Sequence, residues 1–88
     1  MTDLPATDPP TLAQLFAEAR EHARESEVDA VEALLANARA TIREEVPPGP
    51  RRERLLFGCE RVENLVADEP LVAAEYLKAL QDRAADDG

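Results

Sequence analysis

Apolar residues recur at intervals of three and four along this 88-residue chain, from position 12 to position 84. This spacing places them on one face of an α-helix. No segment alternates apolar and polar residues with a period of two, the pattern of a half-buried strand. The sequence therefore predicts an all-α protein, and its fold depends on where the helices begin and end.

The first helix is predicted near residues 11–25. Thr11 followed by Gln14 matches a capping box, in which two residues at a helix start bond reciprocally. Residues 1–10 contain three prolines and two aspartates without periodicity, and they predict a disordered or extended N-terminal arm. The face expected to be buried consists of Leu12, Leu15, Phe16, Ala19 and Ala23.

The next apolar series, from Val28 to Val46, is also helical but has a different phase. At about 100° per residue, it is rotated by roughly 110° from the first series. One straight helix cannot bury both series against the same neighbour. We therefore expect a turn near Ser26, with Ser26 as the N-cap of a second helix over 27–45. The alternative is one continuous helix from 11 to 45 with partners on two sides.

The clearest helix breaker is the segment Pro47, Pro48, Gly49 and Pro50. A third helix is predicted after it, over 51–67. Asp68, Glu69 and Pro70 predict a stop and a new start, with proline at the first position of a fourth helix over 70–85. Residues 86–88 should fray. The faces expected to be buried are Leu55, Cys59, Val62 and Val66 in the third helix, and Val72, Ala73, Tyr76, Leu77, Leu80 and Ala84 in the fourth.

Short connections between amphipathic helices favour antiparallel neighbours. The predicted fold is a small antiparallel bundle of four helices, two helical hairpins joined by a proline-rich turn, with residues 11–85 as a single domain. A stack of two repeat-like hairpins is the alternative. The chain has 16 alanines and 11 leucines but only three aromatic residues. Because this core is thin, we expect added stability from a partner or from self-association.

The charge of the chain limits the environment in which it can work and the kinds of partner that it can bind. The chain carries 19 Asp and Glu against 10 Lys and Arg, a net charge of −9, and Lys78 is its single lysine. This charge repels DNA, RNA and anionic lipid. The composition resembles that of proteins from salt-in halophiles, and an ordinary acidic mesophilic protein is the alternative. With no long apolar run, no secretory signal and one cysteine, we expect a cytoplasmic protein.

The sequence offers no convergent catalytic set. His22, Cys59 and Ser26 are the only residues of their types. We expect Cys59 to be a buried small hydrophobe and His22 a half-buried polar tip at the edge of its helix face. No spacing matches a zinc or calcium site, and no glycine-rich loop is present. We therefore expect no metal, no cofactor and no enzymatic activity; a site assembled only at an oligomer interface is the least favoured alternative.

Three arginines, Arg51, Arg52 and Arg54, lie at the start of the third helix, where the helix dipole disfavours cations. Residues 50–67 hold four Arg and three Glu, whereas residues 68–88 hold two basic and six acidic residues. The third helix is therefore the one part of the chain that is not acidic. Either its arginines pair with the chain's own carboxylates, or they dock an acidic partner or phosphate.

Phe57 lies opposite the apolar stripe of the third helix, on a charged face. Either the N-terminal arm, through Leu4, or the first helix covers it, or it anchors a partner. The leading hypothesis is a non-enzymatic protein–protein interaction or oligomerisation module. The alternative is a regulator that contacts nucleic acid through Arg51, Arg52 and Arg54. The predicted partner-binding residues are Arg51, Arg52, Arg54, Leu56, Phe57 and Arg61.

Overall fold

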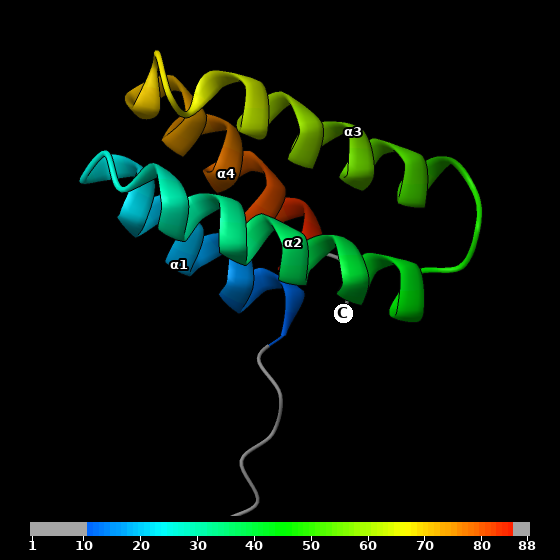
Figure 1. The fold of residues 1–88 in the computed structure, drawn as a ribbon. Coiled ribbons are helices and arrows are strands. Elements are labelled where there is room, and N and C mark those ends of the chain that lie inside the picture. The colour runs from blue at the N-terminus through cyan, green and yellow to red at the C-terminus, as the bar shows by residue number, and fades with distance from the viewer. Residues whose placement is uncertain (1–10, 86–88) are drawn as a thin grey trace, which may run out of the picture.

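A computed structural model describes residues 11–85, and this part of the chain contains four α-helices and no β-strand (Figure 1). The predicted arm, residues 1–10, and the predicted tail, residues 86–88, lie outside the described residues. All four helices begin and end within two residues of the ranges expected from the sequence. Their bounds are α1 Leu12–Arg24, α2 Val28–Glu45, α3 Pro50–Leu65 and α4 Pro70–Ala85.

The helices form a closed ring of neighbours. α1 packs against α2 and α4, and α3 packs against the same two helices. Contact between the first and last helices is expected of a bundle and not of a stack of hairpins. The prediction of an all-α antiparallel bundle is therefore confirmed. In Figure 1 the α1–α2 and α3–α4 turns lie at one end of the bundle, and the proline-rich turn lies at the other.

The turn between α1 and α2 confirms the phase break but corrects the role of Ser26. α1 ends in a Schellman motif, in which the Ser26 N–H donates to the Ala23 carbonyl (3.0 Å) and the Glu27 N–H to the His22 carbonyl (2.9 Å). Ser26 has a φ of +60°, so it is the left-handed residue that terminates α1. The prediction that Ser26 is an N-cap is wrong, because Glu27 holds that position and makes no side-chain capping bond.

The other helix starts follow from local sequence. The Gln14 N–H donates to Thr11 Oγ1 (3.1 Å) and the Thr11 N–H to Gln14 Oε1 (2.7 Å), which confirms the capping box. Pro50 and Pro70 are the first residues of α3 and α4, where a missing N–H has no cost. The proline-rich turn thus ends one residue earlier than expected, because Pro50 belongs to α3.

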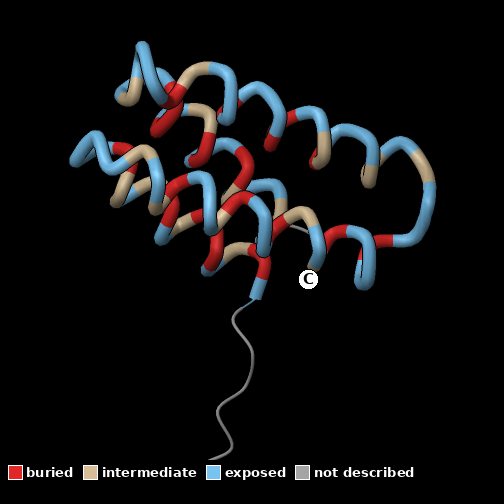
Figure 2. The backbone as a smooth tube through the Cα atoms, viewed as in Figure 1, coloured by how far each residue is buried: buried red, intermediate tan, exposed pale blue. Residues whose placement is uncertain are grey.

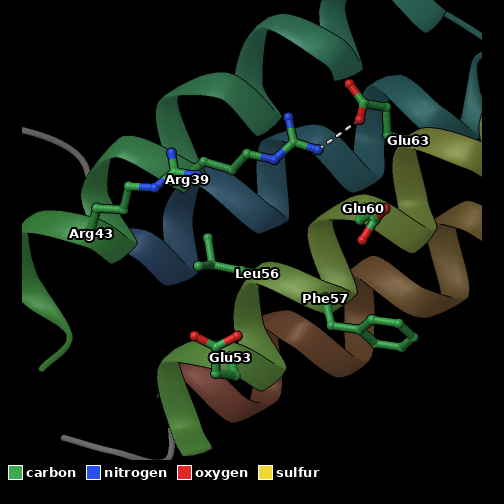
Figure 3. Close-up of a pocket in the computed structure, with 7 residues that line it drawn as sticks. All are labelled: Arg39, Arg43, Glu53, Leu56, Phe57, Glu60 and Glu63. Atoms are coloured by element: carbon green, nitrogen blue, oxygen red, sulfur yellow. Dashed lines mark hydrogen bonds and ion pairs between the residues drawn. The ribbon is translucent and has the colours of Figure 1, made fainter. Parts of the chain in front are cut away.

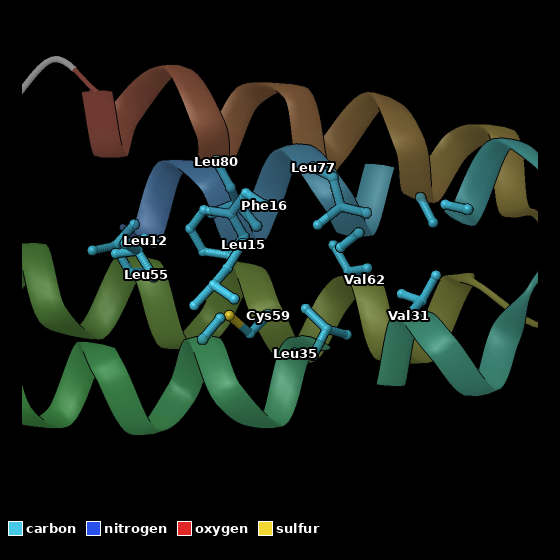
Figure 4. Close-up of a cluster of buried hydrophobic side chains, with 14 of the residues drawn as sticks. Leu12, Leu15, Phe16, Val31, Leu35, Leu55, Cys59, Val62, Leu77 and Leu80 are labelled. Carbon is cyan, nitrogen blue, oxygen red and sulfur yellow. The ribbon is translucent and has the colours of Figure 1, made fainter. Parts of the chain in front are cut away.

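The core is apolar throughout: no polar or charged residue among residues 11–85 is buried. Figure 2 shows the buried positions on the inner faces of the four helices, and Figure 4 shows their side chains meeting along the bundle axis. The face predicted for α1 is entirely buried. In α4 the prediction fails for Val72, which is 42% exposed. The inner face of α4 is centred on Ala73 and Leu77, and Val72 is turned about 100° away from Ala73.

None of the helices within residues 11–85 is long and apolar enough to cross a membrane.

Candidate binding surface on helices α3 and α4

Phe57 is the large apolar side chain that α3 presents to solvent. The helix buries Leu55, Cys59 and Val62, while Phe57 remains 59% exposed. Among residues 11–85 the other exposed large apolar side chains are Leu71 and Val72, both in α4. At this exposure Phe57 is not covered by α1, and the N-terminal arm proposed as a cover lies outside the described residues. Two hollows, one on each side of α3, share Phe57 as a lining residue.

The first, here called the α2/α3 hollow, is polar and is lined by charges of both signs, two arginines and three glutamates (Figure 3). Arg39 of α2 donates through Nη2 to Oε1 of Glu63 on α3, at 2.7 Å. This hydrogen bond raises the pKa of Arg39 above its ordinary value. In Figure 3 Leu56 points toward α2, whereas the ring of Phe57 projects away from it. The lining residues are Arg39, Arg43, Glu53, Leu56, Phe57, Glu60 and Glu63.

The second, here called the α3/α4 groove, is apolar, and the charged side chains that line it within the described part of the chain are all positive. Its volume is about 210 Å³, which is smaller than that of typical enclosed small-molecule sites. Within residues 11–85, two arginines line it, one from each helix, and no carboxylate does. This combination is unusual in a chain whose net charge is −9. The lining residues are Arg54, Phe57, Gly58, Tyr76, Ala79, Leu80 and Arg83.

A third arginine lies beside this groove. The guanidinium carbon of Arg61 is 5.8 Å from the centre of the Tyr76 ring. This distance is within the range of a cation–π contact, which at an exposed site contributes about 0.5–1 kcal/mol. Tyr76 is half-buried, and Arg61 is exposed. The contact extends the positive edge of the groove by about two turns beyond Arg54.

The arginines at the start of α3 have different surroundings. Arg52 donates through Nη2 to the backbone carbonyl of Arg43 at 3.2 Å, near the end of α2. This places a cation at the negative end of the α2 dipole, which is favourable and explains why the residue is tolerated at the start of α3. Arg51 is half-buried and lines a separate hollow at the proline-turn end of the bundle, beside Leu12 and Val46. Neither residue lines the α3/α4 groove.

The six predicted partner-binding residues thus lie around α3 and do not share one face. Arg54 and Phe57 line the α3/α4 groove, and Arg61 lies beside it. Leu56 is half-buried and packs against the core. Arg51 and Arg52 lie toward the proline-rich turn, as described above.

Residues 1–86 match the family described as a domain of unknown function, DUF8101. The chain belongs to this family. No curated protein and no solved structure matches it.

The sequence did not single out the α4 side of the groove. The intervals of three and four residues between Tyr76, Ala79 and Arg83 place them on one helix face, and the sequence alone contained this signal. The sequence assigned Tyr76 to the core face, and it could not show which side of α4 lies against α3. Gly58 was also overlooked: its missing side chain leaves room for Leu80 of α4.

Cys59 and His22, the residues considered for nucleophilic chemistry, do not line the α3/α4 groove. Cys59 is fully buried, and burial raises the pKa of its thiol to about 11. A thiol in this state is a poor nucleophile near neutral pH. His22 lies at the α1–α2 turn, with Nδ1 2.5 Å from Oε1 of Glu27. Among residues 11–85, no three His, Cys, Asp or Glu side chains are grouped so as to hold a metal ion.

Proposed function

We propose that this protein is a small, non-enzymatic binding module that recognises another protein through the outer surface of α3. The observation that carries the proposal is the exposure of Phe57, 59%, in a chain with three aromatic residues. An exposed aromatic ring next to arginines has the composition of interface hot spots. Arg54 and Arg61 lie on the same side of α3 as the groove that Phe57 lines.

A role in contacting nucleic acid has less support. It would use the arginines at the start of α3, yet Arg52 is already hydrogen-bonded to the end of α2. The acidic surface also opposes approach to phosphate, because every Asp and Glu among residues 11–85 is exposed.

The same exposed carboxylates support a second proposal, that the protein works in the cytoplasm of a halophile. Concentrated salt screens the repulsion between surface carboxylates, so a dense acidic surface is tolerated there. Arginine in place of lysine, with Lys78 the one exception, is consistent with this origin.

The test of the binding function is affinity capture from a lysate of the source organism at its native salt concentration. The baits are the wild-type chain, Phe57→Asp, and Leu71→Asp as the matched control. Leu71 is 66% exposed on α4 and lies outside the groove, so the control makes the same chemical change elsewhere. We expect proteins that both wild type and Leu71→Asp retain and that Phe57→Asp loses. Equal capture by all three baits would refute the proposed surface.

Sedimentation of the purified chain distinguishes self-association from binding to another protein. If wild type forms an oligomer that Phe57→Asp does not form, the partner is a second copy. Nuclease treatment of the lysate identifies captured material that depends on nucleic acid, and capture that nuclease abolishes would count against a protein partner.

A further inference from the structure

We infer that the α3/α4 groove binds one class of partner, an acidic amphipathic helix of another protein. This inference rests on the proposed function and specifies what the module recognises. The evidence is the shape of the groove, the order of its side chains along the two helices, and the sign of its charge.

The groove, together with the exposed apolar residue beside it, extends along about three turns of α4. On α4, Val72, Tyr76, Ala79 and Arg83 lie at helical spacing on one face. The lining residues from Tyr76 to Arg83 span seven helical steps, about 10 Å at 1.5 Å per residue, and Val72 beside the groove extends this line to eleven steps, about 16 Å. Val72 is 42% exposed, so the apolar face continues one turn beyond Tyr76. A partner helix would place residues at i, i+3, i+4 and i+7 along this line.

The α3 side of the groove contributes the anchor and much of the charge. Phe57 is next to Gly58, whose missing side chain leaves room for Leu80 of α4, and all three residues line the groove. Arg54 lies one turn before Phe57, and Arg61 lies one turn after it. The apolar strip is therefore flanked by arginines along α3 and ends at Arg83 of α4.

The sign of the charge selects the partner. Arg54 and Arg83 have no ion-pair partner among residues 11–85, unlike Arg39, which pairs with Glu63 in the α2/α3 hollow. A basic helix would meet these arginines with like charge, and an uncharged one would leave them unpaired at the interface. An acidic helix can pair with both while its apolar face covers Phe57. At molar salt, attraction between separated charges is screened, and only ion pairs in direct contact persist. We therefore expect the apolar strip to supply most of the affinity and the arginines to supply the selectivity for an acidic helix.

The experiment is a selection on the full 88-residue chain from a phage-displayed library of amphipathic helices. Flanking positions in the library are randomised among Glu, Lys, Gln and Ser, so the library itself has no charge preference. We expect the enriched helices to be acidic and to bind wild type and Leu71→Asp equally. Their affinity should fall about tenfold or more for Phe57→Asp and for Arg54→Glu/Arg83→Glu. Enrichment of neutral or basic helices overturns the inference.

Two further measurements localise the site and test the competing ligand. Amide chemical shifts should move in α3 and α4 when a selected helix is added, and shifts confined to α1 and α2 would contradict the inference. A fluorescent random-sequence duplex DNA is titrated in parallel. DNA binding that weakens steeply with salt and disappears in Arg54→Glu/Arg83→Glu would overturn the inference in favour of a nucleic-acid site.

The experiments distinguish a failure of the acidic-helix inference from a failure of the proposed binding function. If Phe57→Asp abolishes lysate capture but the selected helices are not acidic, the partner class is wrong and the binding function stands. If Phe57→Asp leaves lysate capture unchanged, the binding function itself is wrong, and the inference that rests on it falls as well.

Discussion

A Cβ atom on Gly58 of α3 would lie 2.5 Å from Cδ2 of Leu80 on α4. Both residues are buried where the two helices meet, and both line the α3/α4 groove. The absence of a side chain at position 58 therefore leaves the space that the Leu80 side chain occupies between the two helices. The same contact supports the groove that flanks Phe57, so packing and the proposed binding surface depend on one residue pair.

Gly58→Ala should destabilise the protein, although alanine is the better helix former by about 1 kcal/mol. The added methyl overlaps the Leu80 side chain, and overpacking of this kind costs about 1–3 kcal/mol. We expect a net loss of about 1 kcal/mol in the free energy of unfolding, measured by denaturant titration.

The Leu80→Ala background tests the cause. Without the leucine methyl groups, Gly58→Ala should become stabilising, by up to about 1 kcal/mol, because only the helix propensity remains. If the effect of Gly58→Ala has the same sign in both backgrounds, the contact with Leu80 is not what constrains position 58.

Ser26→Gly should stabilise the protein. Ser26 has a φ of +60°, a left-handed conformation that costs a residue with a Cβ about 1–2 kcal/mol. Glycine removes this cost but adds freedom to the unfolded chain, so we expect a net gain of about 0.5–1 kcal/mol. Ser26→Ala is the control, since it retains the Cβ and should give no gain. Thermal unfolding of the three proteins measures the difference, and an equal gain with alanine would contradict the explanation.

The buried thiol of Cys59 should make stability fall at alkaline pH. Its pKa is raised by burial from 9.0 to about 11. Well below pH 9.0 both the folded and the unfolded state keep the proton on the thiol. Between pH 9.0 and about 11 the unfolded state loses a proton that the folded state retains, so the free energy of unfolding falls as pH rises, by up to about 2–3 kcal/mol.

Cys59→Ala isolates this contribution. The variant will be less stable at neutral pH, because a buried side chain is truncated, but it lacks the thiol. The slope of unfolding free energy against pH should therefore be shallower than in wild type over the same range. Parallel slopes for the two proteins would show that Cys59 does not titrate as its burial implies.

The helices were predictable because their signals are local. The capping box at Thr11, the prolines at positions 50 and 70, and the phase break near Ser26 each involve residues close in sequence. The identity of the cap at the break was not predictable in the same way. Serine serves both as an N-cap and, less often, as a left-handed residue, and the backbone decides between the two.

The binding surface was only half predictable, because it is made by two helices. The exposure of Phe57 follows from its position opposite the α3 stripe. The contribution of Tyr76 and Arg83 depends on which side of α4 faces α3, which is a tertiary property. The reach of Arg52 to the Arg43 carbonyl likewise depends on the path of the proline-rich turn, which the sequence alone does not specify.

If the protein is halophilic, its stability should rise as KCl increases from dilute to molar concentration. All Asp and Glu side chains of residues 11–85 are exposed, and salt screens their mutual repulsion. Thermal unfolding followed by circular dichroism measures the effect. The variant Glu18→Gln/Glu21→Gln/Glu25→Gln, changed only at exposed carboxylates of α1 and its C-cap, should respond less to KCl. An unchanged spectrum and melting temperature across the range would contradict a halophilic origin.

Phe57→Ala should leave stability almost unchanged, which separates its role from that of a core aromatic. The ring is 59% exposed, so its removal leaves no closed cavity, and alanine favours the helix. We expect a change of less than about 1 kcal/mol in the free energy of unfolding. Phe16, with 0% exposure, is the comparison, and Phe16→Ala should cost about 3–5 kcal/mol. A large loss for Phe57→Ala would mean that the ring is required for folding, and its exposure would then no longer argue for a partner.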